Sequence, residues 1–129
     1  MSVISLEKSA PPDMEEVSEF QEEFAEISET YNSFPDDFER FKSVLEVKLP
    51  GYPNGTVPIS KLGGGVVCPV YKVRKFRCEC IRHKGNDSGI RIIYAYKPDE
   101  NKIIFLELYH KNQKANNDKD RIYKYLSAA

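Results

Sequence analysis

Two apolar stripes at helical spacing, one directly after the other, place the strongest constraint on how this chain folds. The first stripe repeats at intervals of three and four residues and consists of Val17, Phe20, Phe24, Ile27 and Tyr31. The second stripe follows Pro35, a residue suited to a first helical turn, and consists of Phe38, Phe41, Leu45 and Leu49. Each stripe needs an apolar surface to cover. The pattern therefore predicts a helical hairpin over residues 13–49.

A capping signal marks the expected start of the first helix. Asp13 stands three residues before Glu16, which is the spacing of a capping box. Two prolines interrupt the chain just before it. Residues 1–12 are interpreted as a short strand over residues 2–7 or as a flexible arm.

The second half of the chain is typical of a sheet. Runs rich in β-branched and aromatic residues cover residues 70–81, 90–96 and 102–111. Because the runs are separated by short turn segments, we expect them to pair as successive hairpins in an antiparallel meander. Residues 50–69 are rich in proline and glycine and predict a loop. Residues 118–127 predict a short C-terminal helix capped by Asp118.

These elements predict one α+β domain over residues 1–129, with the hairpin packed on one face of the antiparallel sheet. The other face of the sheet is then left free for a site. No stretch approaches the roughly 20 apolar residues of a membrane-spanning helix. The first residues also lack the basic and apolar regions of a secretory signal. We therefore expect a cytoplasmic protein that does not span a membrane.

The near-neutral net charge of −1 hides a strong asymmetry. Residues 1–60 contain 4 Lys/Arg and 13 Asp/Glu, whereas residues 61–129 contain 15 Lys/Arg and 7 Asp/Glu. The basic half either faces an anionic partner or is neutralised by the acidic half in the folded domain. Cations are densest over residues 70–84, where aromatic side chains stand between them. This interleaving suits phosphate contact combined with base stacking.

The cysteines do not match a structural zinc site. Cys78 and Cys80 form a Cys-x-Cys pair, Cys68 stands apart, and only His83 and His110 are available as further soft ligands. Structural zinc sites usually combine two closely spaced ligand pairs. Reduced thiols are therefore favoured over a metal or a disulfide, and no cofactor is expected.

The second half of the chain resembles the RelE/ParE superfamily of type II toxins. The first part of the resemblance is the strand Tyr71-Lys72-Val73-Arg74. The others are Ser88-Gly89-Ile90-Arg91-Ile92-Ile93-Tyr94 and Ile104-Phe105-Leu106-Glu107-Leu108-Tyr109-His110-Lys111. The similarity covers residues 70–111, with the helical hairpin and the final helix in the expected order. The chain departs from the family in its longer, acidic N-terminal half and in Ile90, which replaces the usual aromatic residue.

The resemblance implies a RelE-like fold and one of two activities. RelE-like and HigB-like members are endoribonucleases that cleave mRNA on the ribosome, whereas ParE-like members inhibit DNA gyrase without cutting RNA. Both kinds are silenced by a cognate antitoxin in a hetero-oligomer. A third alternative is an inactive homologue that acts only as a binding protein.

Metal-free RNA cleavage needs a base, an acid and cations that stabilise the developing phosphorane charge. The resemblance places Arg91 at the family's phosphate-contacting position, and a guanidinium binds phosphate through two parallel hydrogen bonds. Lys72 and Arg74 alternate onto one strand face and are expected to point into the same groove. The alternative for all three is an ordinary solvated cation.

Three residues that close the last run complete the candidate site. His110 suits acid–base chemistry because an imidazole titrates near neutrality. Tyr109 and Lys111 share the other strand face and suit base stacking and phosphate binding, respectively. His110 also has a purely structural alternative, because it alternates with Leu106 and Leu108 at the edge of the predicted core.

Overall fold

The two apolar stripes form consecutive helices in the computed structural model, which describes residues 10–84 and 87–127. Helix α1 spans Ser18–Thr30 and helix α2 spans Phe34–Lys48. Pro35 lies in the first turn of α2, where its missing N–H costs no helical hydrogen bond. The helical hairpin is therefore present, but it begins at Ser18 and not at residue 13. The strand expected over residues 2–7 lies outside the described residues.

The hairpin begins late because Asp13–Glu16 forms a strand, β1, and not a capping box. β1 runs parallel to strand β5 (Lys102–His110), with Asp13 opposite Lys102. The N–H of Asp13 also donates to the carbonyl of Asn101 at 3.0 Å. Pairing along a sheet edge satisfies more backbone groups than a capping box does, so the long-range pairing prevails over the local signal.

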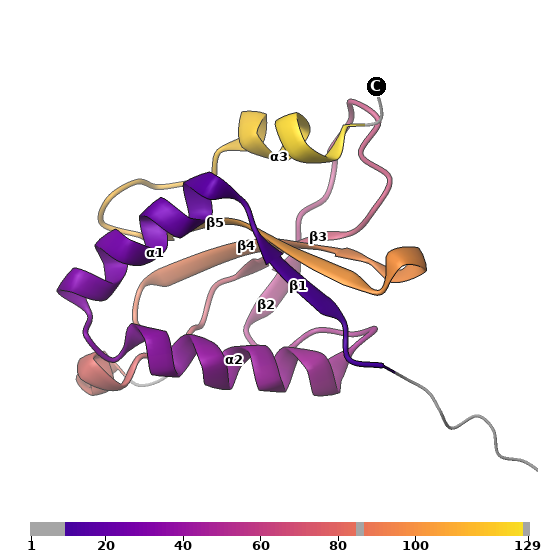
Figure 1. Cartoon of the computed structure of the whole chain (residues 1–129). Helices are drawn as coiled ribbons and strands as arrows, with labels where there is room; N and C mark the ends of the chain where they lie inside the picture. Colours follow the sequence, from indigo (N-terminus) through magenta and orange to yellow (C-terminus); the bar gives the residue numbers. More distant parts are fainter. Residues whose placement is uncertain (1–9, 85–86, 128–129) are drawn as a thin grey trace, which may run out of the picture.

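Five strands form one sheet in the order β1-β5-β4-β3-β2 (Figure 1). The other strands are β2 (Thr56–Pro58), β3 (Val70–Val73) and β4 (Ile90–Lys97). β3, β4 and β5 pair antiparallel in chain order, as the meander predicts. β1 adds a parallel edge, and β2 lies within the segment predicted as a loop. The chain is therefore an α+β protein with a mixed sheet, not a purely antiparallel one.

Strand β3 is shorter than the run of residues 70–81 predicts. It ends at Val73 because the next two N–H groups donate to the carbonyl of Gly55, at 2.8 and 3.1 Å. The chain then leaves the sheet, and 3₁₀ turns occupy Glu79–Lys84 (η2). The Cys-x-Cys pair therefore lies where the chain enters a turn and not on a strand. A second 3₁₀ turn, η3 (Pro98–Glu100), connects β4 to β5.

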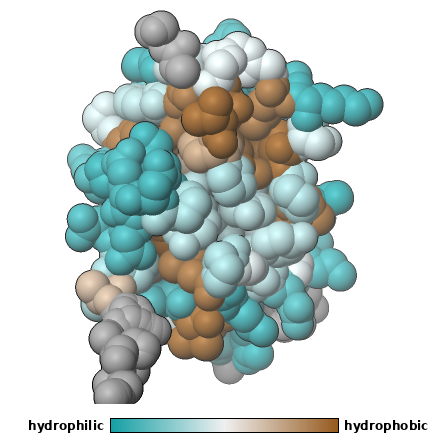
Figure 2. Space-filling view, turned by 90° about the vertical axis from the view of Figure 1, so that its right-hand side faces the viewer, coloured by the Kyte–Doolittle hydropathy of each residue, from teal (hydrophilic) through white to brown (hydrophobic). Residues whose placement is uncertain are grey.

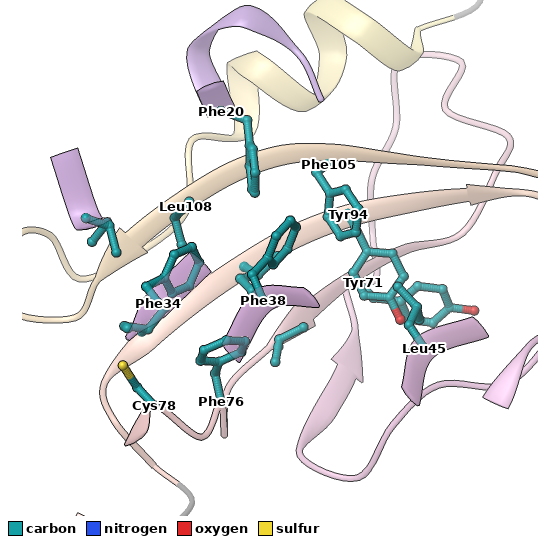
Figure 3. Close-up of a cluster of buried hydrophobic side chains, with 14 of the residues drawn as sticks. Phe20, Phe34, Phe38, Leu45, Tyr71, Phe76, Cys78, Tyr94, Phe105 and Leu108 are labelled. Atoms are coloured by element: carbon teal, nitrogen blue, oxygen red, sulfur yellow. The ribbon is translucent and has the colours of Figure 1, made fainter. Parts of the chain in front are cut away.

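The helical hairpin covers one face of the sheet, as predicted. Aromatic side chains of α1 and α2 meet those of β4 and β5 there (Figure 3). The ring centroids of Phe38 and Phe105 lie 4.9 Å apart, and those of Phe20 and Phe105 lie 5.5 Å apart. Full burial of such rings contributes roughly 2–3 kcal/mol each from the removal of apolar surface from water. This aromatic cluster fixes the sheet on which the candidate residues stand.

The opposite face of the sheet is covered in part, which corrects the expectation that it is free. Helix α3 (Lys119–Leu126) packs Ile122 and Leu126 against this face, above the sheet in Figure 1. Asp118 caps α3 as predicted, since its carboxylate accepts a hydrogen bond from the N–H of Arg121 at 3.2 Å. The segment between β2 and β3 packs Ile59, Leu62 and Val66 against the same face, so α3 is not its only cover.

Large apolar side chains also remain on the surface. Val47, near the end of α2, is 81% exposed, and Val67, in the segment between β2 and β3, is 87% exposed. Figure 2 shows hydrophobic surface in separate areas of one side of the molecule, with hydrophilic side chains between them. Covering these areas with another chain would be favourable, because it would remove apolar surface from water.

A buried carboxylate ties α2 to the turn that contains the cysteines. Asp37 accepts hydrogen bonds from the hydroxyl of Ser33 at 2.7 Å, from the N–H of Glu79 at 2.9 Å and from Arg40 at 2.9 Å. Burial raises the pKa of Asp37, but the hydrogen bonds from Ser33, Glu79 and Arg40 outweigh this and hold the pKa below its ordinary value. The ionised carboxylate is therefore the form that stabilises the fold.

Replacing Asp37 by alanine is expected to lower the free energy of unfolding by about 3 kcal/mol at neutral pH, because three donors lose their acceptor. Since the pKa of Asp37 is lower in the folded than in the unfolded chain, this stabilisation is complete above the unfolded value of about 3.9. It is lost as the pH falls through the folded value. Urea unfolding of both proteins at neutral pH and below about pH 3 tests this. A stability difference that is equal at both pH values would contradict it.

Candidate functional site

Cationic side chains meet at the open end of the α3 face. Lys72 on β3 stands opposite Ile93 on β4, and Arg91 on β4 stands opposite Tyr109 on β5. Ile93 and Tyr109 both pack in the cluster under α3. Because side chains of paired residues share a sheet face, Lys72 and Arg91 lie on this face as well. The Nζ atom of Lys72 lies 6.0 Å from the ring centroid of Tyr109.

The guanidinium of Arg91 is held at the wall of a hollow. Its Nη1 donates to the carbonyl of Arg74 at 2.7 Å and to the carboxylate of Asp87 at 3.2 Å, and its side chain is 12% exposed. The hollow has a volume of about 250 Å³ and is lined by Gly55, Val57, Arg74, Lys75, Asp87 and Arg91. Arg74, Lys75 and Arg91 therefore line one cavity, and Arg91 is fixed before any ligand arrives. Lys72 does not line this hollow, but it lies close enough to Arg74 and Arg91 for their charges to act on it. We call Lys72, Arg74 and Arg91 the cationic cluster.

The charged groups of this region lie close enough together to shift the pKa values of Lys72 and Asp87. Burial lowers the pKa of Lys72, and the positive charges of Arg74 and Arg91 lower it further. Burial raises the pKa of Asp87, but hydrogen bonds from the Gly89 N–H and Arg91 outweigh this and hold that pKa below its ordinary value. An anion bound in the hollow would relieve the repulsion among the three cations.

Tyr109 lies beside the cluster but does not offer a face for stacking. Its side chain is 3% exposed, with Lys72 on the ring and Lys114 at 5.1 Å from the ring centroid. Burial raises the pKa of its phenol, and the charge of Glu107 raises it further. Its hydroxyl has no hydrogen-bond partner among the described residues. The structure therefore places Tyr109 beneath the cations, with the ammonium groups of Lys72 and Lys114 over its ring.

His110 points to the opposite face from the cationic cluster. Its Nδ1 accepts from the N–H of Asn112 at 3.0 Å, so its Nε2 carries the proton that it shares with the carbonyl of Ser88 at 3.1 Å. The ring stacks on Tyr31 at 5.6 Å between centroids. These contacts are those expected if His110 has a structural role and not an acid–base role. The arrangement does not bring His110 to Lys72 or Arg91.

A β-bulge explains why His110 and the cationic cluster lie on different faces. Tyr94 pairs with Phe105, whereas Ile93 pairs with Glu107, so Leu106 is an extra residue in β5. Leu106 packs under α3, while Leu108 packs under the hairpin. Simple alternation along β5 places His110 on the same face as Leu106. Because of the bulge, His110 lies instead on the opposite face from Leu106.

Lys111 lies at the rim between the two faces. It is exposed, its N–H donates to the carbonyl of Gly89 at 2.8 Å, and its charge is one of those that lower the pKa of Asp87. It also lines a second hollow of about 560 Å³, together with His110 and Asp87. A long cationic side chain at this position can contact an anion that extends beyond the cationic cluster.

Glu107 is a residue of this region that the sequence reasoning missed. It is 1% exposed, forms an ion pair with Lys114 and accepts a hydrogen bond from the N–H of Asp118 at 2.8 Å. It therefore anchors the segment that leads into α3. A single acidic residue within the apolar run Leu106-Glu107-Leu108 is the signal that would have identified it, because buried carboxylates need partners.

Two further findings bear on the chemistry available here. In the described part of the chain, no group of three or more His, Cys, Asp or Glu side chains is arranged to hold a metal ion. No described helix has the length and apolar character that crossing a membrane requires.

Comparisons with protein-family models, with curated proteins and with solved structures find no match to this chain. We therefore infer function from the residues and their geometry.

Proposed function

We propose that this protein is the toxin of a type II toxin–antitoxin system and that it cleaves mRNA on the ribosome by metal-free chemistry. The observation that carries the proposal is that Arg74 and Arg91 line one hollow, with Lys72 on the neighbouring strand close enough for their charges to lower its pKa. The resemblance to RelE-like toxins concerns the same strands. The order of hairpin, antiparallel strands β3 to β5 and final helix also supports it.

The cationic cluster suits the charge that develops during RNA cleavage. When the ribose 2′-hydroxyl gives its proton to a solvent water and its oxygen attacks the adjacent phosphorus, negative charge accumulates on the non-bridging oxygens. Arg91 and Arg74 bind these oxygens in the proposed complex, and Arg91 is already oriented by the carbonyl of Arg74 and by Asp87. Lys72 is the proposed proton donor to the leaving oxygen, because its lowered pKa makes its ammonium a stronger acid than an ordinary lysine.

One observation favours a second candidate, a ParE-like inhibitor of DNA gyrase. Tyr109 is buried and His110 faces the opposite side, so Lys72 is the proton-transferring group that the described residues place in the cluster. A surface that binds without cleaving needs cations but no acid–base pair. An inactive homologue that only binds would likewise need the cations but no acid–base pair.

The proposed partner is a cognate antitoxin that covers part of the toxin surface. The exposed side chains of Val47 and Val67 are apolar positions that such a chain would bury. In the proposed hetero-oligomer, anionic groups of the antitoxin lie against the cationic cluster. The other proposed partner is mRNA in the ribosome.

The experiment that tests the function is a map of mRNA 5′ ends after brief expression in a bacterial host. We expect new ends within coding regions, at recurrent positions relative to codons, in translated messages only. DNA damage without new RNA ends would identify the gyrase inhibitor and overturn the nuclease. The absence of both, together with normal growth, would leave the binding protein.

A further inference from the structure

The two cysteines of the Cys-x-Cys pair have their sulfur atoms in contact. The Sγ atoms of Cys78 and Cys80 lie 3.6 Å apart, and both thiols are free. The N–H of Ile81 donates to the carbonyl of Cys78 at 2.9 Å, which closes a turn that holds the two side chains together. The sulfurs need to approach by only about 1.5 Å to reach the S–S bond length of about 2.05 Å.

The two thiols differ in their access to solvent. Cys78 is 0% exposed and belongs to the aromatic cluster under the hairpin. Cys80 is exposed and lines the hollow of about 560 Å³ that also contains Asp87 and Lys111. A small oxidant therefore reaches Cys80 first. The buried Cys78 thiol is then close enough to react with the oxidised Cys80.

The hydroxyl of Ser33 lies between the thiols and a buried carboxylate. It accepts a hydrogen bond from the N–H of Cys80 at 3.0 Å, contacts Cys78 Sγ at 3.5 Å and donates to Asp37 at 2.7 Å. Burial raises the pKa of Cys78 to about 12. Burial also acts to raise the pKa of Cys80, but hydrogen bonds from the backbone of Ser33 and from Cys78 outweigh it and hold that pKa below the ordinary value. Cys80 therefore has the greater thiolate character, and thiolates are the form that reacts.

We propose that Cys78 and Cys80 form a peroxide-sensitive pair, in which a hydroperoxide oxidises Cys80 and Cys78 then closes a reversible disulfide. This role is independent of the proposed toxin activity.

The chemistry balances with one hydroperoxide for each disulfide. The Cys80 thiolate attacks the terminal peroxide oxygen, the O–O bond breaks, and the sulfenic acid of Cys80 forms as the alkoxide or hydroxide leaves and takes a proton. Cys78 sulfur then attacks Cys80 sulfur, the S–O bond breaks, and the hydroxide leaves as water with the proton of Cys78. The peroxide is reduced by two electrons, and the two thiols supply them. A dithiol reductant reverses the step.

The remaining cysteine provides an internal control. Cys68 is half-buried, and burial raises the pKa of its thiol. It lies in the segment before β3, among the side chains packed under α3, and therefore on the other face of the sheet from the pair. Its reaction with peroxide reports what an ordinary cysteine of this chain does.

The test exposes the reduced full chain to a small excess of hydrogen peroxide and follows each cysteine by thiol alkylation and peptide mass mapping. We expect Cys80 to lose its thiol at least about tenfold faster than Cys68, with a Cys78–Cys80 disulfide as the product. Oxidation of Cys80 at the rate of Cys68, or a stable sulfenic acid with no disulfide in the wild-type chain, would overturn the proposal.

Two variants separate the roles of the pair. Cys78→Ser is expected to stop at a sulfenic acid on residue 80 that a dimedone probe traps, and Cys80→Ser is expected to leave Cys78 unreactive behind the aromatic cluster. Cys68→Ser should react as the wild type does. Rapid oxidation of Cys78 in the Cys80→Ser variant would contradict the assigned order. The wild-type mapping decides the proposal even where a variant does not fold.

Discussion

Replacing Arg91 by alanine is expected to abolish growth arrest while the protein remains folded. Arg91 is the fixed guanidinium of the cationic cluster, and in the proposed reaction it stabilises charge that appears only in the transition state. Removing one such preorganised donor costs about 100-fold to 1,000-fold in rate. Colony counts on inducing medium should therefore recover almost to those of the empty vector.

The fold should tolerate this change. The side chain of Arg91 lies at the wall of the hollow and not in the aromatic cluster, and its loss removes one hydrogen bond to a carbonyl and one ion pair, which together contribute about 2 kcal/mol. Arg77→Ala is the matched control, because Arg77 is 63% exposed and lines a different hollow, near α2. A folded Arg91→Ala protein that still arrests growth as the wild type does would contradict the assigned role. Arg91→Lys should retain an intermediate effect, since a lysine keeps the charge but not the two parallel bonds.

Replacing Gly89 by alanine is expected to destabilise the fold by about 3 kcal/mol. Gly89 has a φ of +89°, a conformation that residues with a side chain rarely adopt. A Cβ atom there would lie 2.6 Å from Nε2 and 2.8 Å from Cε1 of His110. The ring has little room to move, because it is stacked on Tyr31 and bonded to Ser88. Urea unfolding measures the loss.

A double substitution isolates the contact with the ring. In a His110→Ala background the steric part of the cost disappears and only the strained φ remains, so Gly89→Ala should cost clearly less there. Gly63→Ala is the control, since a Cβ at Gly63 meets nothing within 4 Å, and it should change stability by less than about 0.5 kcal/mol. Strictly additive effects of the Gly89 and His110 changes would contradict the steric explanation.

The elements that the sequence predicts well are those whose signal is local. The stripes of α1 and α2 repeat at helical spacing, and Asp118 caps α3 where the pattern places it. β1 was not predictable in this way. Asp13–Glu16 carries three acidic residues and no apolar alternation, and its strand conformation depends on pairing with β5, far along the chain. The early end of β3 likewise depends on a distant carbonyl, that of Gly55.

The same distinction holds for the candidate site. The sequence predicts by alternation that Lys72 and Arg74 share one strand face. That Arg91 lies on the face of Lys72 depends on the register of β3 and β4, in which Lys72 pairs with Ile93. The position of His110 depends on the bulge at Leu106, and no residue in that run signals a bulge. The burial of Tyr109 depends on α3 and on Lys114, which pack over it from the following segment. The structure therefore supports a functional role for the cationic cluster more strongly than for Tyr109 or His110.

The central claim is that the cationic cluster grips a sugar–phosphate backbone, and equilibrium binding of single-stranded RNA over a series of salt concentrations tests it most directly. Three phosphate contacts predict that log affinity falls against log salt with a slope of about −2, since each contact on single strands contributes about −0.7. The double variant Lys72→Met with Arg74→Met should bind more weakly and show a slope smaller in magnitude by about 1.4, whereas Arg77→Met should match the wild type. If the double variant keeps the wild-type affinity and slope, the cluster does not bind the backbone and the account is contradicted.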